Sequence, residues 1–125
     1  MDKLFQSVID QDPAPVVICD CDHTIVYMNP AAIRRYQNRG GKALMGQSLM
    51  GCHNEASRAR IRKVLDWFRE SREHNRIFTD HNAKENKDVY MVALRDAEGN
   101  LIGYYEKHEY RSPEAGLTYD FSKSL

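Results

Sequence analysis

The chain has 125 residues, of which 42% are hydrophobic, and its 18 basic residues balance its 18 acidic ones. This length and apolar content suit one domain with a single core, while zero net charge gives no field that would attract nucleic acid or an anionic membrane. No apolar run approaches the roughly 20 residues that cross a bilayer, and no basic segment followed by an apolar one opens the chain, so we expect a cytoplasmic protein.

The first predicted element is a short helix over about residues 3–10, which Asp2 can cap. Its apolar residues recur at spacings that place them in one stripe: Leu4, Phe5, Val8 and Ile9. The stripe needs a covering surface, and two alternatives are open. It can pack on the chain's own sheet, or it can pair with the same helix of a second subunit, which makes these four residues candidate dimer contacts.

A hairpin of two short strands follows. Residues 16–19 and 24–28 are apolar runs rich in β-branched side chains, and the four residues between them tolerate a tight turn. Asn29 and Pro30 then favour a helix start, because Asn can cap a helix and Pro pre-sets the backbone of its first turn. The glycine-interrupted segment 38–51 predicts short helical turns. Its methionines, Met45 and Met50, suit either core packing or a cavity wall.

The longest predicted helix begins after Asn54, with Glu55 in its first turn and Arg69 and Arg72 near its end. Four apolar residues fall at i, i+3, i+4 and i+7 and form one face: Ile61, Val64, Leu65 and Phe68. Burial of each contributes roughly 1.5 to 3 kcal/mol, so this face should fix the helix on a sheet.

Three further strands are predicted over residues 76–80, 88–95 and 101–110, and a glycine-containing loop joins the last two as a hairpin. Gly103 leaves no side chain on the last strand, so a helix or ligand could approach closely there. The tail after residue 111 can add an edge strand, dock on a neighbour or fray. Strands at both ends with helices between them indicate an α+β domain.

Three motifs together resemble those of a PAS domain. They are the segment Ile25-Val26-Tyr27-Met28-Asn29-Pro30-Ala31-Ala32 with its N-x-A-A element, Leu44-x-Gly46, and a D-x-x-G-x-x-x-G hairpin from Asp96 to Gly103. The resemblance covers about residues 4–111. It implies a five-stranded antiparallel sheet in the order 2-1-5-4-3 with helices packed on one face. The implied organisation is an N-terminal helix at 1–12, a PAS core at 13–111 and a tail at 112–125.

The resemblance further implies a small-molecule-sensing or protein-interaction module of signal transduction, often dimeric through the first helix. A ligand of unknown identity would lie between the sheet and the long helix. We expect the following residues to line that cavity: Ile18, Tyr27, Asn29, Met45, Met50, His53, Ile61, Leu65, Phe68, Met91 and Tyr104. The segment from Gly51 to Ser57 is similar to that of a PAS subgroup with a Cys-His element before the long helix.

His53 leaves one cofactor alternative open, because a neutral imidazole at a cavity rim can be an axial haem ligand. Flavin photochemistry is not expected, since the cysteine of PAS-type flavin sensors is followed by an arginine and Cys52 is not. A Cys52–His53 nucleophile is not expected either, because adjacent side chains at a helix start point apart. No other pair of histidines has metal-site spacing, and we expect His23, His74, His81 and His108 at the surface. The sequence therefore predicts neither an enzyme nor a metal centre.

Overall fold

Five strands form one antiparallel sheet in the computed structural model of the chain, which describes residues 2–122. They are β1 (Val17–Asp20), β2 (Ile25–Met28), β3 (Arg76–Asn82), β4 (Lys87–Arg95) and β5 (Leu101–Tyr110). Their spatial order is β2-β1-β5-β4-β3, and every neighbouring pair is antiparallel. The predicted α+β class and strand order are confirmed. Met1 and residues 123–125, which belong to the two predicted terminal segments, lie outside the described residues.

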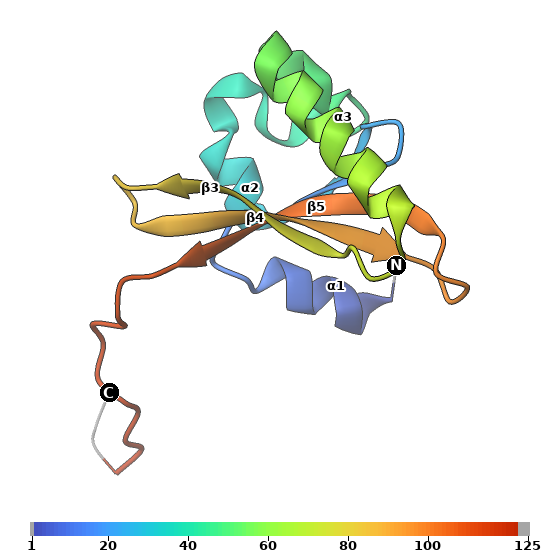
Figure 1. The fold of residues 1–125 in the computed structure, drawn as a ribbon. Coiled ribbons are helices and arrows are strands. Elements are labelled where there is room, and N and C mark those ends of the chain that lie inside the picture. Colours follow the sequence, from blue (N-terminus) through green and yellow to red (C-terminus); the bar gives the residue numbers. More distant parts are fainter. Residues whose placement is uncertain (1, 123–125) are drawn as a thin grey trace.

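The helices lie in the predicted order between and before the strands. They are α1 (Lys3–Asp10), α2 (Pro30–Arg35) and α3 (Glu55–Glu70), with three short 3₁₀ turns, η1 (Gln37–Arg39), η2 (Gly41–Leu44) and η3 (Leu49–Cys52). Figure 1 shows α2 and α3 on one side of the sheet and α1 on the opposite side. α3 ends at Glu70, so Arg72 lies beyond its last turn. Within residues 2–122, no helix combines the length and the apolar character that crossing a membrane requires.

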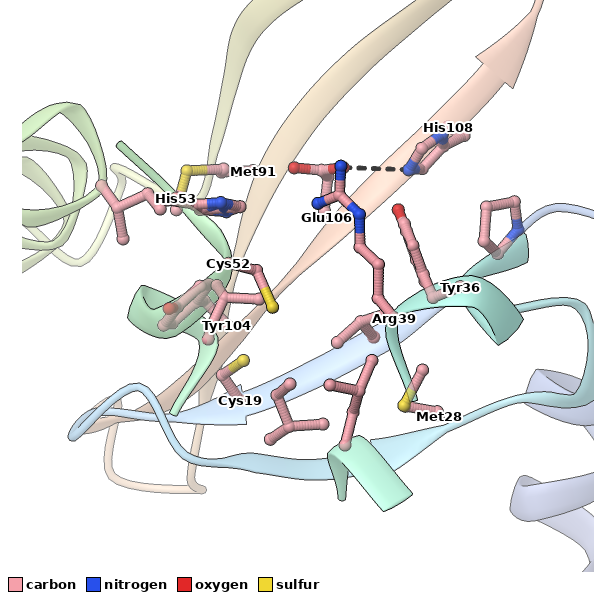
Figure 2. Close-up of a pocket in the computed structure, with 16 residues that line it drawn as sticks. Cys19, Met28, Tyr36, Arg39, Cys52, His53, Met91, Tyr104, Glu106 and His108 are labelled. Carbon is pink, nitrogen blue, oxygen red and sulfur yellow. Dashed lines mark hydrogen bonds and ion pairs between the residues drawn. The ribbon is translucent and has the colours of Figure 1, made fainter. Parts of the chain in front are cut away.

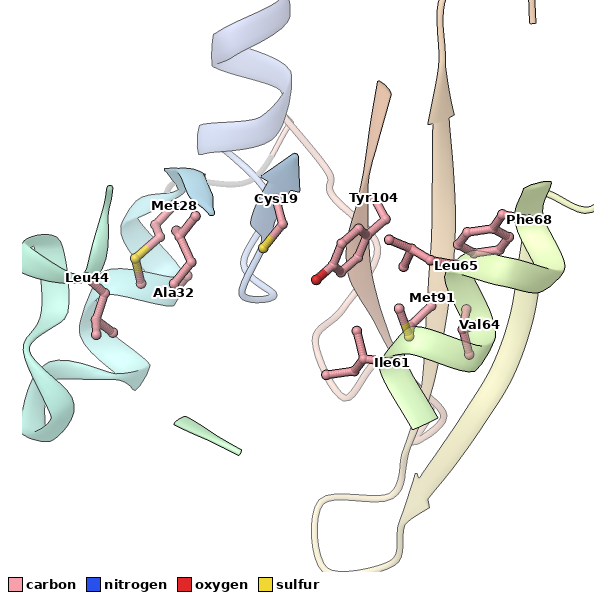
Figure 3. Packing of buried hydrophobic residues seen from close by; sticks show 11 residues of the cluster. Cys19, Met28, Ala32, Leu44, Ile61, Val64, Leu65, Phe68, Met91 and Tyr104 are labelled. Atoms are coloured by element: carbon pink, nitrogen blue, oxygen red, sulfur yellow. The ribbon is translucent and has the colours of Figure 1, made fainter. Parts of the chain in front are cut away.

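The core lies between α3 and the sheet. The predicted face of α3 is buried throughout, as Ile61, Val64, Leu65 and Phe68 are each 8% exposed or less. Figure 3 shows these side chains on one side of the core, Met28, Ala32 and Leu44 on the other, and Cys19 and Tyr104 between the two groups. The burial of α3 therefore closes the same core that the hairpin and α2 begin.

Asn29 ties three elements together. Its side-chain oxygen accepts hydrogen bonds from the backbone nitrogens of Val16 and Ala32, both at 2.9 Å, so it caps α2 and holds the start of β1. Its amide nitrogen donates to three carbonyls at 3.0 to 3.3 Å, those of Ile9, Asp12 and Ala14. The residue is completely buried. A side chain that sequence reasoning assigned to the cavity is thus a structural junction.

Arg95 of β4 holds the C-terminal end of α3. One of its guanidinium nitrogens donates to the carbonyls of Phe68, Ser71 and His74 at 2.6, 3.0 and 3.2 Å. The last carbonyls of a helix have no partner within the helix, so these bonds satisfy acceptors that would otherwise need water. α3 is thereby fixed to the sheet at this end.

Gly103 lies where strands β5 and β1 approach each other closely. A Cβ built there would lie 2.3 Å from the carbonyl oxygen of Cys19, the residue next to its β1 partner Asp20. Position 103 must therefore lack a side chain because strand β1 lies against it. The sequence had suggested a helix or a ligand at this place instead.

The two chain ends expose apolar side chains. α1 has no buried residue, and Leu4, Phe5 and Val8 are 72%, 66% and 71% exposed. The tail has no regular structure over residues 112–122, where Leu117, Tyr119 and Phe121 are exposed. The edge strand considered for the tail is therefore not formed within the described residues, and the apolar stripe of α1 is left uncovered by the chain's own sheet.

Candidate functional site

A cavity of about 90 Å³ lies between the sheet, the 3₁₀ turns and the N-terminal half of α3. Most of its wall is apolar, and that part is formed by Pro15, Val17, Cys19, Ile25, Met28, Leu44, Leu49, Cys52, Ile61, Met91 and Tyr104. We call this space the main cavity. Such a volume has room for about six water-sized groups, the size of a short aliphatic chain.

A polar rim borders one side of the main cavity. It consists of Tyr36, Arg39, His53, Glu106 and His108. Figure 2 shows Glu106, Arg39, Tyr36 and His108 gathered on the side away from Cys19 and Met28. Residues 104, 106 and 108 alternate along β5, so their side chains point to the same face of the sheet. The inner face of β5 thus changes from apolar at Tyr104 to polar at His108.

Tyr104 and His23 form a bonded pair next to the apolar wall. The Tyr104 hydroxyl lies 2.8 Å from His23 Nδ1, and the two rings meet edge to face with centroids 5.7 Å apart. Burial raises the pKa of Tyr104 and, with help from Arg62 and Arg69, lowers that of His23. Both shifts favour a neutral phenol that donates to a neutral imidazole, so Tyr104 is held rigidly at the cavity.

Neither cysteine of the cavity has the surroundings of a reactive thiol within residues 2–122. Cys19 is 1% exposed, and burial raises its pKa to about 11, so the uncharged thiol is favoured at neutral pH. Cys52 ends η3 and lines the same cavity without an acid or base hydrogen-bonded to its sulfur among the described residues. These thiols act as small apolar groups of the wall.

His53 follows η3 and contributes its ring to the cavity rim. Burial is the main cause that lowers its pKa, which favours the neutral imidazole that a metal would require. The space beside it is nevertheless small. An apolar cavity of about 150 Å³ accommodates benzene in an engineered protein, and haem is far larger than benzene. The main cavity by itself is therefore too small for a haem.

The structure brings four of the eleven predicted cavity residues to the main cavity: His53, Ile61, Met91 and Tyr104. Leu65 and Phe68 instead fill the core below the second half of α3, where helix and sheet are in direct contact. Met45 and Met50 pack against that core without lining the cavity. The predicted space under the whole helix face is thus confined to its first turns.

Ile18 and Tyr27 pair with each other across β1 and β2, on the strand positions that alternate with the cavity-lining ones. The Tyr27 hydroxyl contacts Asp10 and accepts from Gln6 of α1, so this side chain belongs to the opposite face of the sheet. The residues that do line the cavity are their neighbours Val17, Cys19 and Met28. Strand alternation was the available signal, but it does not by itself say which set faces inward.

His108 is the histidine whose position differs most clearly from the prediction. The prediction that it lies at the surface is wrong, because its side chain is 5% exposed. Its Nε2 lies 3.0 Å from a carboxylate oxygen of Glu106, and both residues border the cavity. The signal that could have indicated this was its spacing of two residues from Glu106 and four from Tyr104, which puts all three on the inner face. His74 is also partly covered, since its ring stacks on Trp67 with centroids 3.9 Å apart.

Comparison with known proteins agrees with this geometry. No curated protein matches the chain. Among solved structures, the PAS domain of a Colwellia psychrerythraea protein has a TM-score of 0.63 at 14% identity, with 88% of this chain and 98% of that chain covered. The PAS domain of BvgS from Bordetella pertussis has a TM-score of 0.56 at 17% identity, with 90% and 88% covered.

The Vibrio cholerae Aer2 receptor, described as a dual PAS-heme oxygen sensor, is also similar, with a TM-score of 0.54 at 20% identity and with 75% and 90% covered. At these identities the likeness shows the fold alone. A family model described as the PAS fold matches residues 9–107, which is most of the chain. Since the sheet also has the strand order that the motifs implied, the chain belongs to the PAS fold family.

Proposed function

We propose that this PAS domain senses a small molecule in the main cavity and passes the signal on as a homodimer. PAS domains are sensory and signalling modules and are in general not catalytic, which supports a binding role. The observation that carries the proposal is the apolar cavity beneath the first turns of α3 with a polar rim on one side. Apolar pockets with a few convergent polar groups are the usual form of small-molecule sites.

The exposed stripe of α1 supports the dimer. Three large apolar side chains of α1, those of Leu4, Phe5 and Val8, are mostly exposed. Burying each against a partner helix would contribute up to about 1.5 to 3 kcal/mol. We therefore propose α1, within residues 1–12, as the dimerisation element, residues 13–111 as the sensing core and 112–125 as a tail. Ile9 contributes less to this surface because it is half-buried.

The link from ligand to dimer runs through adjacent residues. Met28 lines the cavity, and the next residue, Asn29, donates to the carbonyl of Ile9 near the end of α1 at 3.0 Å. A ligand that displaces Met28 would therefore act on the residue that holds α1. The expected cytoplasmic location and the absence of nucleic-acid partners stay predictions.

The ligand half of the proposal is tested by titrating the isotope-labelled protein with 1-hexanol and following backbone amide shifts by NMR. We expect saturable shifts at Ile61, Met91 and Tyr104 and none at Phe78, whose side chain is exposed on β3. Native mass spectrometry of protein purified from cells adds a search for a retained small molecule. Absence of both saturable shifts and a retained molecule would refute a sensing cavity.

The dimer half is tested by analytical ultracentrifugation of wild-type protein and of Phe5→Lys. Phe78→Lys is the matched control, because Phe78 is an exposed aromatic residue of similar accessibility on the sheet. We expect the α1 variant alone to be monomeric. A wild-type protein that is monomeric at all accessible concentrations would contradict this half.

Haem remains the alternative, and the size of the cavity does not favour it. The observation for it is the neutral His53 ring at the rim, together with the similar fold of a PAS-heme sensor. Reconstitution with hemin decides the question. A Soret band that is lost in His53→Ala would support haem, and no band, or one unchanged in that variant, would exclude His53 as its ligand.

A further inference from the structure

A second pocket, more open to solvent than the main cavity, adjoins its polar rim. It has a volume of about 190 Å³, and it shares Tyr36, Glu106 and His108 with the main cavity. The remainder of its wall comes from α2, α3, β3 and the start of β4 and is largely polar. We call it the side cavity. A molecule that occupied both spaces would have an apolar end in the first and a polar end in the second.

Lys87 lines the side cavity and is buried there without a full set of partners. Its side chain is 3% exposed, and its ammonium nitrogen has no hydrogen-bond partner within residues 2–122. The nearest anion is Glu85, 3.2 Å away. That carboxylate is already held by both terminal guanidinium nitrogens of Arg35, each at 2.9 Å. One carboxylate thus serves two cations, and within residues 2–122 the only further partner of the ammonium is the Tyr110 ring, whose centroid lies 5.7 Å from the nitrogen. A buried ammonium left partly uncompensated is costly.

His108 is the second buried group of the side cavity with free hydrogen-bonding capacity. Its Nε2 faces Glu106 at 3.0 Å, while its buried Nδ1 has no partner in the described part of the chain. His108 pairs in register with Val89, two residues from Lys87 on β4. Alternating positions of a strand face the same side, so both groups lie on the inner face of the sheet.

We propose that the ligand is a short-chain monocarboxylate, an inference that rests on the proposed function and names its ligand class. The aliphatic chain lies in the main cavity and the carboxylate in the side cavity, where it accepts from the ammonium of Lys87. His108 Nδ1 makes the second contact, as an N–H donor when the ring carries both protons. Arg60 also lines the space and makes no ion pair within residues 2–122.

The charges of the side cavity disfavour a ligand with two negative charges. Lys87, Arg60 and the Arg35–Glu85 pair are met by Asp80 of β3 and Glu106 of β5, which border the same space. These charges balance when His108 is neutral, so one carboxylate is compensated when the His108 ring carries both protons, whereas a phosphate or dicarboxylate would place its second charge against Asp80 and Glu106. The side cavity should therefore bind a monocarboxylate in preference to an anion with two charges. Lys87 should favour a carboxylate over the hydroxyl of an alcohol.

Hexanoate, 1-hexanol and acetate are the probes for this inference, titrated into the full chain and followed by amide shifts. The variant is Lys87→Met, which keeps an unbranched side chain only one atom shorter and removes its charge. Lys84→Met is the matched control, because Lys84 is exposed in the same hairpin. We expect Lys87→Met to weaken hexanoate binding about 10- to 100-fold and to leave 1-hexanol binding unchanged. Lys84→Met should change neither, and acetate should bind far more weakly than hexanoate.

Each other outcome counts against a stated part. If 1-hexanol binds and hexanoate binding is unaffected by Lys87→Met, the carboxylate class is refuted while the sensing cavity stands. If neither compound binds, both proposals fail. If acetate binds as tightly as hexanoate, the site takes an anion without an apolar body. Should Lys87→Met not fold, His108→Phe removes the second contact, and unchanged hexanoate affinity in that variant overturns the proposal.

Discussion

Replacing Asn29 should lower the free energy of unfolding far more than the loss of a helix cap alone would. Asn29→Ala removes the cap of α2, which costs about 1 kcal/mol. It also leaves the buried backbone nitrogen of Val16 without its acceptor, a loss of about 1 to 3 kcal/mol, and takes the amide donor away from three carbonyls. We therefore expect a loss of about 3 to 5 kcal/mol in the free energy of unfolding.

Urea denaturation followed by the fluorescence of Trp67, the single tryptophan, measures this loss. Asn54→Ala is the matched comparison, since Asn54 caps α3 through one 2.9 Å bond to Ser57 and is exposed. It should lose only about 1 kcal/mol. The aspartate variants sharpen the test. Asn54→Asp should leave the stability nearly unchanged. Asn29→Asp should still destabilise the protein, because it keeps the cap but turns an oxygen toward three carbonyl oxygens. Equal losses at the two positions would refute the role of Asn29 as a junction.

Three further predictions follow from single contacts. Gly103→Ala should lose more than about 2 kcal/mol, because its Cβ would meet the Cys19 carbonyl at 2.3 Å, whereas Gly51→Ala, with nothing within 4 Å, should lose little; equal urea midpoints would contradict the close approach. The pKa of Cys19 is raised from 9.0 to about 11 by burial, so the unfolded chain ionises first and stability should fall as pH rises from 9 to 11. Cys19→Ala should flatten this part of the profile, and an unchanged slope would argue against it. Arg95→Met should lower the free energy of unfolding by about 2 to 4 kcal/mol, because it leaves carbonyls unpaired. Arg69→Met, at an exposed position of α3, should lower it by less than about 1 kcal/mol. Similar losses in the two variants would contradict the role of Arg95 in fixing the end of α3.

Local chemistry was enough to predict the elements and, through the motif resemblance, the sheet order. The hairpin, the Asn29 and Asn54 caps and the four-residue face of α3 are each encoded within a few residues. The cavity is not encoded in this way, because its wall depends on which set of alternating strand residues faces α3. An irregularity between Ile18 and Cys19 shifts the register of β1 against β2, so that Val17, Cys19, Ile25 and Met28 all face inward.

The polar end of the site was missed for a related reason. A histidine among glutamates, as His108 is, resembles a surface residue, and only the register of β5 with β4 places it beside Val89 on the inner face. Its burial also requires α2 and α3 to cover that end of the sheet, a condition set by packing between distant segments. Leu65 and Phe68 show the reverse case, since an apolar helix face does not reveal where it meets the sheet directly and where it leaves space.

Arg95 fixes one end of α3, while the cavity lies under the other end. Arg95 of β4 donates to the carbonyl of Phe68 in the last turn of α3 and to the carbonyls of Ser71 and His74 just beyond the helix, and Leu65 and Phe68 pack there with almost no exposure. The cavity lies under the other end, where Ile61 is the one buried residue of the helix that forms its wall. Because the C-terminal end is fixed in this way, we expect a ligand that needs more room to displace the Asn54 end of the helix, with the largest movement at η3 and His53.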